Sequence, residues 1–121
     1  MINYKFYTTE ALIKNREHLF DNENDKVVMT TYSHCTVNTP LCRDLKLNKR
    51  SEIFECNYKK WLNEDILYSS LDFEECLTLA AAVAYDSTVH PDETVYVTAN
   101  PQAVPIANKF FGEDSIILLE D

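Results

Sequence analysis

Three acidic residues stand at the start of the most apolar helix that the sequence predicts, and they offer the clearest candidate chemistry. Asp72, Glu74 and Glu75 precede a run rich in leucine and alanine. Carboxylate oxygens hold Mg²⁺ or Mn²⁺ while leaving positions open for a substrate, which indicates metal-dependent phosphodiester cleavage. The same residues also have a structural explanation, because Asp72 and Glu75 fit a helix cap and a favourable charge at a helix N-terminus.

The cysteines form a weaker candidate site. Cys35, Cys42, Cys56 and Cys76 include no C-x-x-C pair, so zinc-ribbon and thioredoxin-like sites have no support. We interpret the four as reduced thiols of a cytosolic protein. Two alternatives stay open: a metal site at His34, Cys35 and Cys42, and nucleophilic catalysis by Cys35. The second would require His34 to activate its neighbour Cys35. It is disfavoured because adjacent side chains on a strand point to opposite faces.

Charge limits the partners of the chain. The formal net charge is −9 over 121 residues, which repels phosphate backbones and suits a protein partner with a basic surface. Ordinary solubility also explains such a charge. The only concentrated positive charge is at residues 40–50, where it would hold an anionic group or form a solvated face; it comprises Arg43, Lys46, Lys49 and Arg50.

Missing sequence features exclude several classes of protein. Gly112 is the only glycine, so neither G-x-G-x-x-G nor a P-loop is present, and both phosphate cradles require glycines. We therefore expect no dinucleotide enzyme, no P-loop NTPase and no cofactor. No apolar run approaches the ~20 residues that cross a bilayer, and no signal peptide is evident. We expect a cytoplasmic protein with no membrane association.

Alternating strand and helix patterns predict one three-layer α/β domain over residues 1–121, with a mainly parallel sheet and right-handed crossovers. The predicted strands are 2–6, half-buried, then 27–32, 94–98 and 116–119, the last in the sheet interior. The predicted helices are 10–20, 51–62 with Ser51 as cap, 73–85, and a segment from the Asn100 cap to Gly112 that contains Pro105. Polar residues at the carboxyl ends of the strands, Thr30–Ser33 and Thr98–Asn100, are expected at the functional edge of the sheet.

A family resemblance covers about residues 72–121. The runs 75–82 (ECLTLAAA), 97–100 (VTAN) and 106–110 (IANKF) resemble the C-terminal half of PIN domains, which read D-A-x-x-L-A-A-A, V-T-x-D and an I-A-K-K-F-like helix. PIN domains are α/β metal-dependent ribonucleases, so the resemblance implies a PIN-like or Rossmann-like topology. By position, Glu75 replaces a metal-binding Asp, Asn100 replaces an Asp, and Glu52 or Glu55 takes the place of a helix Glu. Thr30–Tyr32 stands where the family places its first Asp.

Two functions follow as expectations. The first is a non-catalytic protein-binding or inhibitory module that covers the basic surface of a nucleic-acid-binding protein, as inhibitors from phages or other mobile elements often do. The alternative is a divergent endoribonuclease using Mg²⁺ or Mn²⁺ and RNA as substrate. Its catalytic residues would be Glu75, Asn100, Asp72 and Glu52, and its metal ligands Glu75, Glu74 and Asn100.

Overall fold

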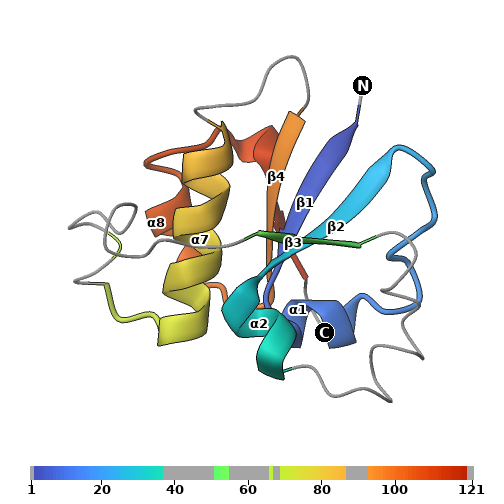
Figure 1. The fold of residues 1–121 in the computed structure, drawn as a ribbon. Coiled ribbons are helices and arrows are strands. Elements are labelled where there is room, and N and C mark those ends of the chain that lie inside the picture. Colours follow the sequence, from blue (N-terminus) through green and yellow to red (C-terminus); the bar gives the residue numbers. More distant parts are fainter. Residues whose placement is uncertain (1, 37–50, 55–65, 67–68, 87–92, 120–121) are drawn as a thin grey trace.

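Five parallel strands form one sheet in the order β3-β2-β1-β4-β5 (Figure 1). The computed structural model describes residues 2–36, 51–54, 66, 69–86 and 93–119, and the side chains of 34–36 and 51–54 lie outside this description. The strands are β1 (Asn3–Tyr7), β2 (Asp25–Thr30), β3 (Ser51–Phe54), β4 (Glu93–Thr98) and β5 (Ile116–Leu118).

Helices cover both faces of this sheet, which confirms the predicted three-layer α/β architecture. The helices are α1 (Thr9–Lys14), α2 (Thr31–Thr36), α7 (Phe73–Asp86), α8 (Ala103–Ala107) and the 3-10 turn η1 (Glu113–Ser115). On one face, Phe6, Val28 and Tyr96 pack against α7 and α8. On the other face, a second core joins Leu12 of α1 to strand residues that include Val97.

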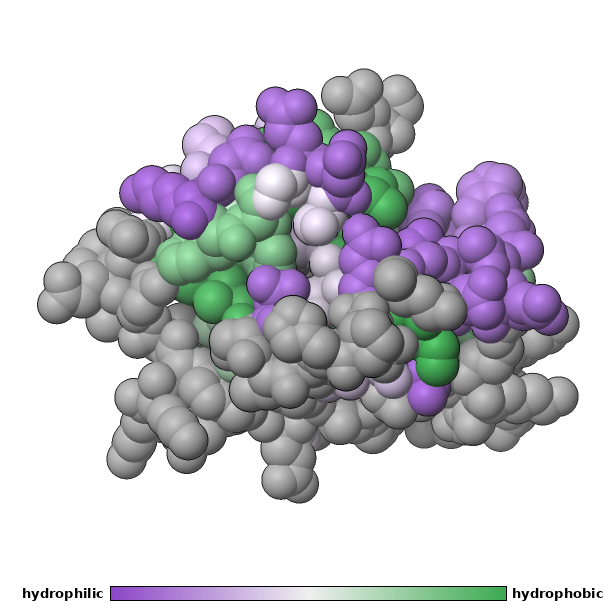
Figure 2. Space-filling model, turned by 90° about the horizontal axis from the view of Figure 1, so that it is seen from above, coloured by the Kyte–Doolittle hydropathy of each residue, from purple (hydrophilic) through white to green (hydrophobic). Residues whose placement is uncertain are grey.

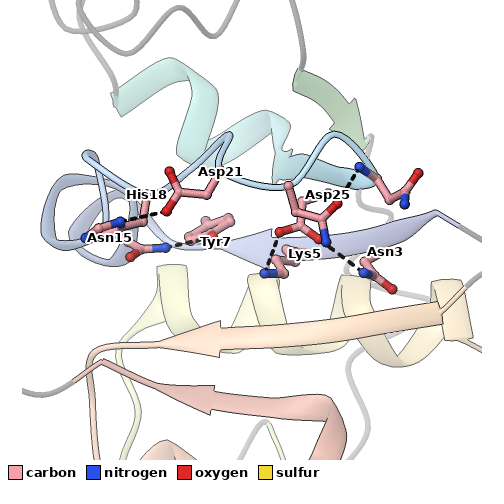
Figure 3. A network of polar contacts seen from close by, with 9 residues as sticks. Asn3, Lys5, Tyr7, Asn15, His18, Asp21 and Asp25 are labelled. Carbon is pink, nitrogen blue, oxygen red and sulfur yellow. Dashed lines mark hydrogen bonds and ion pairs between the residues drawn. The ribbon is translucent and has the colours of Figure 1, made fainter.

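The strand β1 lies at the centre of the sheet. Asn3–Lys5 are half-buried, as the alternating sequence predicted, whereas Phe6 and Tyr7 are both buried. The strand pairs with β2 on one side and with β4 on the other. Its polar residues are accommodated by partners on β2: Lys5 Nζ lies 2.8 Å from Asp25 Oδ2, and Asn3 Nδ2 donates to Asp25 Oδ1 at 3.1 Å (Figure 3). A polar pattern therefore occupies the middle of the sheet because its charges are paired there.

The second strand ends two residues earlier than predicted. We expected a strand over 27–32, but β2 ends at Thr30 and Thr31 begins α2. The hydroxyl of Thr30 accepts a hydrogen bond from the backbone N–H of Ser33 at 3.1 Å, as an N-cap residue does. His34 and Cys35 are thus in a helix, not on a strand as expected.

The strand β3 replaces the start of a predicted helix. The spacing of apolar residues favoured a helix from Ser51 to residue 62, yet residues 51–54 pair in parallel with β2, with Met29 opposite Ile53. Residues 55–62 of that predicted helix, which include Glu55 and Cys56, lie outside the described residues. The same holds for Cys42 and for the basic residues of 43–50. Pairing with a neighbouring strand has overridden the local periodicity.

The helix α1 is shorter than its predicted range of 10–20. Thr8 caps it by accepting from the N–H of Ala11, and Asn15 ends it at the C-cap. The Asn15 side chain donates to the hydroxyl of buried Tyr7 at 3.1 Å, while His18 and Asp21 pair in the turn that follows (Figure 3). This hydrogen bond holds Asn15, the residue at which α1 ends, against the last residue of β1.

The C-terminal unit differs from its prediction at three points. Ala107 ends α8, so Gly112 does not cap it and instead precedes η1, with φ −70°. Pro105 lies within the first turn of α8, where its missing N–H removes no helical hydrogen bond. The strand β5 pairs only with β4 and is half-buried at the sheet edge, not in the interior. Within the described ranges, no helix is long and apolar enough to cross a membrane.

Candidate functional site

The candidate site lies where β1 and β4 end side by side. Chain connections leave these central strands in opposite directions, to β2 and to β5, which makes this pair the switch point of the sheet. Ligand crevices of open parallel sheets lie outside the carboxyl ends of strands at such a point. Figure 1 shows α1, α2 and the first turn of α7 gathered at this lower end of the sheet.

Two acidic residues fix the start of α7. The N–H of Glu75 donates to Asp72 Oδ1 at 2.8 Å, and the N–H of Cys76 donates to the Asp72 carbonyl at 3.0 Å. These bonds confirm Asp72 as the helix cap. The Glu74 carboxylate reaches across to α1, where it accepts from the N–H of Thr9 at 2.8 Å and from its hydroxyl at 3.2 Å. Glu74 therefore joins the first turns of two helices.

The third acidic residue, Glu75, turns inward and is only 5% exposed. Its two oxygens accept hydrogen bonds from β4: Oε2 from the hydroxyl of Tyr96, and Oε1 from the hydroxyl of Thr98 at 3.0 Å. Asp72 and Glu75 have the spacing of a capping box, in which each side chain bonds to the backbone N–H of the other residue. Only the bond to Asp72 forms here, because the Glu75 side chain bonds to the sheet. Of the three acids, Asp72 caps α7 itself, while Glu74 and Glu75 join the helix to α1 and to β4.

Burial controls the protonation of this cluster. Desolvation raises the pKa of Glu75, the hydrogen bonds from Tyr96 and Thr98 oppose the rise, and the charges of Asp72 and Glu10 add to it. Desolvation also raises the pKa of Tyr96 well above 10, with Glu75 adding to the shift. Tyr96 therefore keeps its proton at neutral pH, and its hydroxyl donates a hydrogen bond to the carboxyl group of Glu75.

The Asn100 side chain serves the turn after β4. Its Oδ1 accepts from the N–H of Gln102 at 3.0 Å, and its own N–H donates to the Thr98 hydroxyl at 3.0 Å. The assigned N-cap of α8 is Gln102, so Asn100 stabilises the preceding turn and not the helix start that the sequence predicted. Thr98 links Asn100 to Glu75, but the amide of Asn100 is directed to its own turn.

The other predicted site residues lie apart from this cluster. Glu52 lies on β3, three strand spacings or about 14 Å from β4, and in a strand where the resemblance placed a helix. Thr30–Ser33 begins at the last residue of β2, at the same edge, but β1 separates β2 from β4. The strand that pairs with β4 is β1, whose last residue, Tyr7, lies opposite Val97.

The geometry does not fit the divalent metal ion that the resemblance implies. Both oxygens of Glu75 already accept hydrogen bonds from the protein. The Asp72 side chain caps α7, the Glu74 carboxylate bonds to Thr9, and the Asn100 side chain bonds within its own turn. In the part of the chain that the structure describes, no three His, Cys, Asp or Glu side chains group as metal ligands. We therefore derive no step through a metal ion.

Sequence reasoning missed two members of the cluster. Tyr96 belongs to an apolar strand, where an aromatic residue indicates core packing, and nothing local marks its hydroxyl as a partner of Glu75. Thr9 follows the first predicted strand, at a position where a threonine is typical of a helix cap. One signal was available, since a Thr-Thr-Glu run after the first strand places hydroxyls at the edge where parallel strands end.

The two buried threonines of β4 provide a matched test of the cluster. We expect Thr98→Val to lower the free energy of unfolding by about 1–3 kcal/mol, because it removes a hydrogen bond to a buried carboxyl. It should also raise the pKa of Glu75, measured by carbon-13 NMR titration. Thr94 is also buried, and its hydroxyl has no hydrogen-bond partner among the described residues. Thr94→Val should therefore neither lower the free energy of unfolding nor raise the pKa of Glu75. Equal effects of both variants would contradict the assignment.

The pH dependence of stability tests the burial of Glu75. Its folded pKa lies above the ordinary value of 4.5, so its protonated form stabilises the fold below that pH. This contribution is lost as pH rises through the folded pKa. We expect the stability of the unmodified protein, relative to Glu75→Gln, to fall over that interval in urea unfolding between about pH 4 and 8. If the stability of the unmodified protein relative to Glu75→Gln stays constant or rises with pH, the carboxyl group of Glu75 is not desolvated.

Comparisons with models of protein families, with curated proteins and with solved structures find no match to this chain. What the cluster can do is therefore argued from its own geometry. Its hydrogen bonds join α7 to α1 and to β4, and they occupy the carboxylates that the sequence offered for catalysis.

Proposed function

We propose that this protein is a small acidic binding module that acts by covering the basic surface of a nucleic-acid-binding protein. The observation that carries the proposal is the division of its acidic residues into two groups. The acids at the switch point are engaged in internal hydrogen bonds, whereas most of the other described acids are exposed. Exposed charge acts on a partner, while internal charge serves the fold.

The exposed acids are distributed over several elements. They occur in the crossover from β1 to β2, at the end of α7, at the start of β4 and in η1. They are Glu10, Glu17, Asp21, Glu23, Asp86, Glu93, Glu113 and Asp114. Such a distribution produces a broad negative field that steers a basic partner and rejects nucleic acid.

Few described basic residues reduce this field. Lys14, Arg16 and Lys109 are exposed and Lys26 is half-buried, while Lys5 is paired with buried Asp25. Figure 2 views the molecule from the end at which β1 begins, and hydrophilic residues occupy much of its described surface. The exposed charge in the described ranges is therefore mainly negative, in line with the formal net charge of −9.

Salt and RNA together provide the test of this function. We expect a basic nucleic-acid-binding protein captured by the tagged chain to be released at about 0.5 M salt, where the Debye length is about 4 Å. Single-stranded polyuridylate should also displace it, because both ligands require the same basic surface. A Glu113→Gln, Asp114→Asn variant keeps the shape of both side chains and removes their charges. Its complex should therefore dissociate at lower salt. A complex insensitive to salt and to RNA would contradict the proposal.

The alternative function, a metal-dependent ribonuclease, keeps one supporting observation. Glu75 is a carboxyl group at the switch point, which is where α/β proteins place their ligands. Against it, Glu75 is nearly inaccessible and both its oxygens already accept hydrogen bonds.

Incubation with single-stranded RNA and Mn²⁺ separates the two functions. We expect no cleavage beyond that of the Glu75→Gln variant, because the proposed module has no role for Glu75 in chemistry. Mn²⁺-dependent cleavage by the unmodified protein that is absent from Glu75→Gln would instead favour the ribonuclease. Folding of the variant is checked by circular dichroism, so that lost cleavage reports lost chemistry.

A further inference from the structure

Two aromatic rings lie exposed together near the switch point. Tyr32 of α2 is 44% exposed and Phe73, the first residue of α7, is 51% exposed. Their ring centroids are 5.3 Å apart and their planes meet at 83°, so the two rings form an aromatic corner. Each ring therefore contacts the other while keeping a large part of its surface in solvent, which is unusual for side chains of this size.

Acidic residues flank the aromatic corner. Asp72, directly before Phe73, is exposed, and Glu74, directly after it, is half-buried in its bonds with Thr9. The corner thus combines apolar ring surface with a negative potential. That combination matches a ligand that is both cationic and planar.

We propose that the aromatic corner of Tyr32 and Phe73 docks an arginine side chain of the basic protein partner. This inference rests on the proposed function and identifies the contact that it uses. A guanidinium group stacks on an aromatic face and pairs with a neighbouring carboxylate such as Asp72, whereas an ammonium group is a compact, strongly hydrated charge. Arginine is also enriched where binding energy concentrates in protein interfaces.

The ring contact prepares the corner for this ligand. Because Tyr32 and Phe73 already hold each other across two helices, less side-chain freedom is lost on binding than for two separate rings. The acids supply long-range attraction, and the rings supply the preference for arginine over lysine. The two contributions respond differently to mutation and can be measured separately.

The test compares octa-arginine with octa-lysine, two probes of equal charge, by fluorescence titration at low salt. We expect octa-arginine to bind about two- to fivefold more tightly, the range of an exposed cation–π contact. Phe73→Leu and Tyr32→Leu should remove this preference while leaving octa-lysine binding unchanged. Ile2→Ala, which truncates an exposed apolar residue at the opposite end of the sheet, should preserve it.

A measurement on the unmodified protein avoids any dependence on variant folding. Arginine methylene protons that lie over an aromatic ring shift upfield in the NMR spectrum of the bound peptide, and we expect this shift. Its absence overturns the docking inference. Equal binding of both peptides overturns the inference but leaves the proposed function standing, whereas no binding of either peptide overturns both.

Discussion

The buried carboxyl group of Glu75 is the constraint on which the arrangement of α7 and the central strands depends. Removing a carboxyl group from water is costly unless hydrogen bonds replace the lost solvation. Here the hydroxyls of Tyr96 and Thr98 supply them, so the first turn of α7 must lie against the end of β4. Asp72 fixes where the helix begins, and Glu74 then determines where α1 lies relative to it.

Internal and external acids have different roles in this molecule. Asp25, Glu74 and Glu75 are buried or half-buried, and each meets a donor or a cation from another element. The exposed acids contribute to the long-range field. The internal acids occupy the position where a parallel sheet of this kind places its ligands. The same geometry weakens a metal-dependent mechanism and is compatible with the proposed recognition of a partner by charge. The aromatic corner adds a short-range contact to that field.

Much of the fold was predictable from local signals. The alanine-rich helix after Asp72 and the strand after residue 93 were both identified, because an N-cap followed by an apolar run, and a β-branched run bounded by polar turns, are each local patterns. For the site, Glu75 and Asp72 were identified as important residues. The role of Glu75 was not, since its partners Tyr96 and Thr98 are more than 20 residues away in the chain.

The sequence by itself determined the fold class, the start of α7 and the acidic character of the surface, because composition and short-range spacing control these properties. Only the tertiary structure decided the order of the strands. It placed β1 in the centre, where Asp25 of β2 pairs with Lys5. It made residues 51–54 a strand against their helical spacing, because hydrogen bonds to β2 outweigh the local preference. It also directed Glu75 inward, since only the folded sheet brings two hydroxyl donors to its carboxylate.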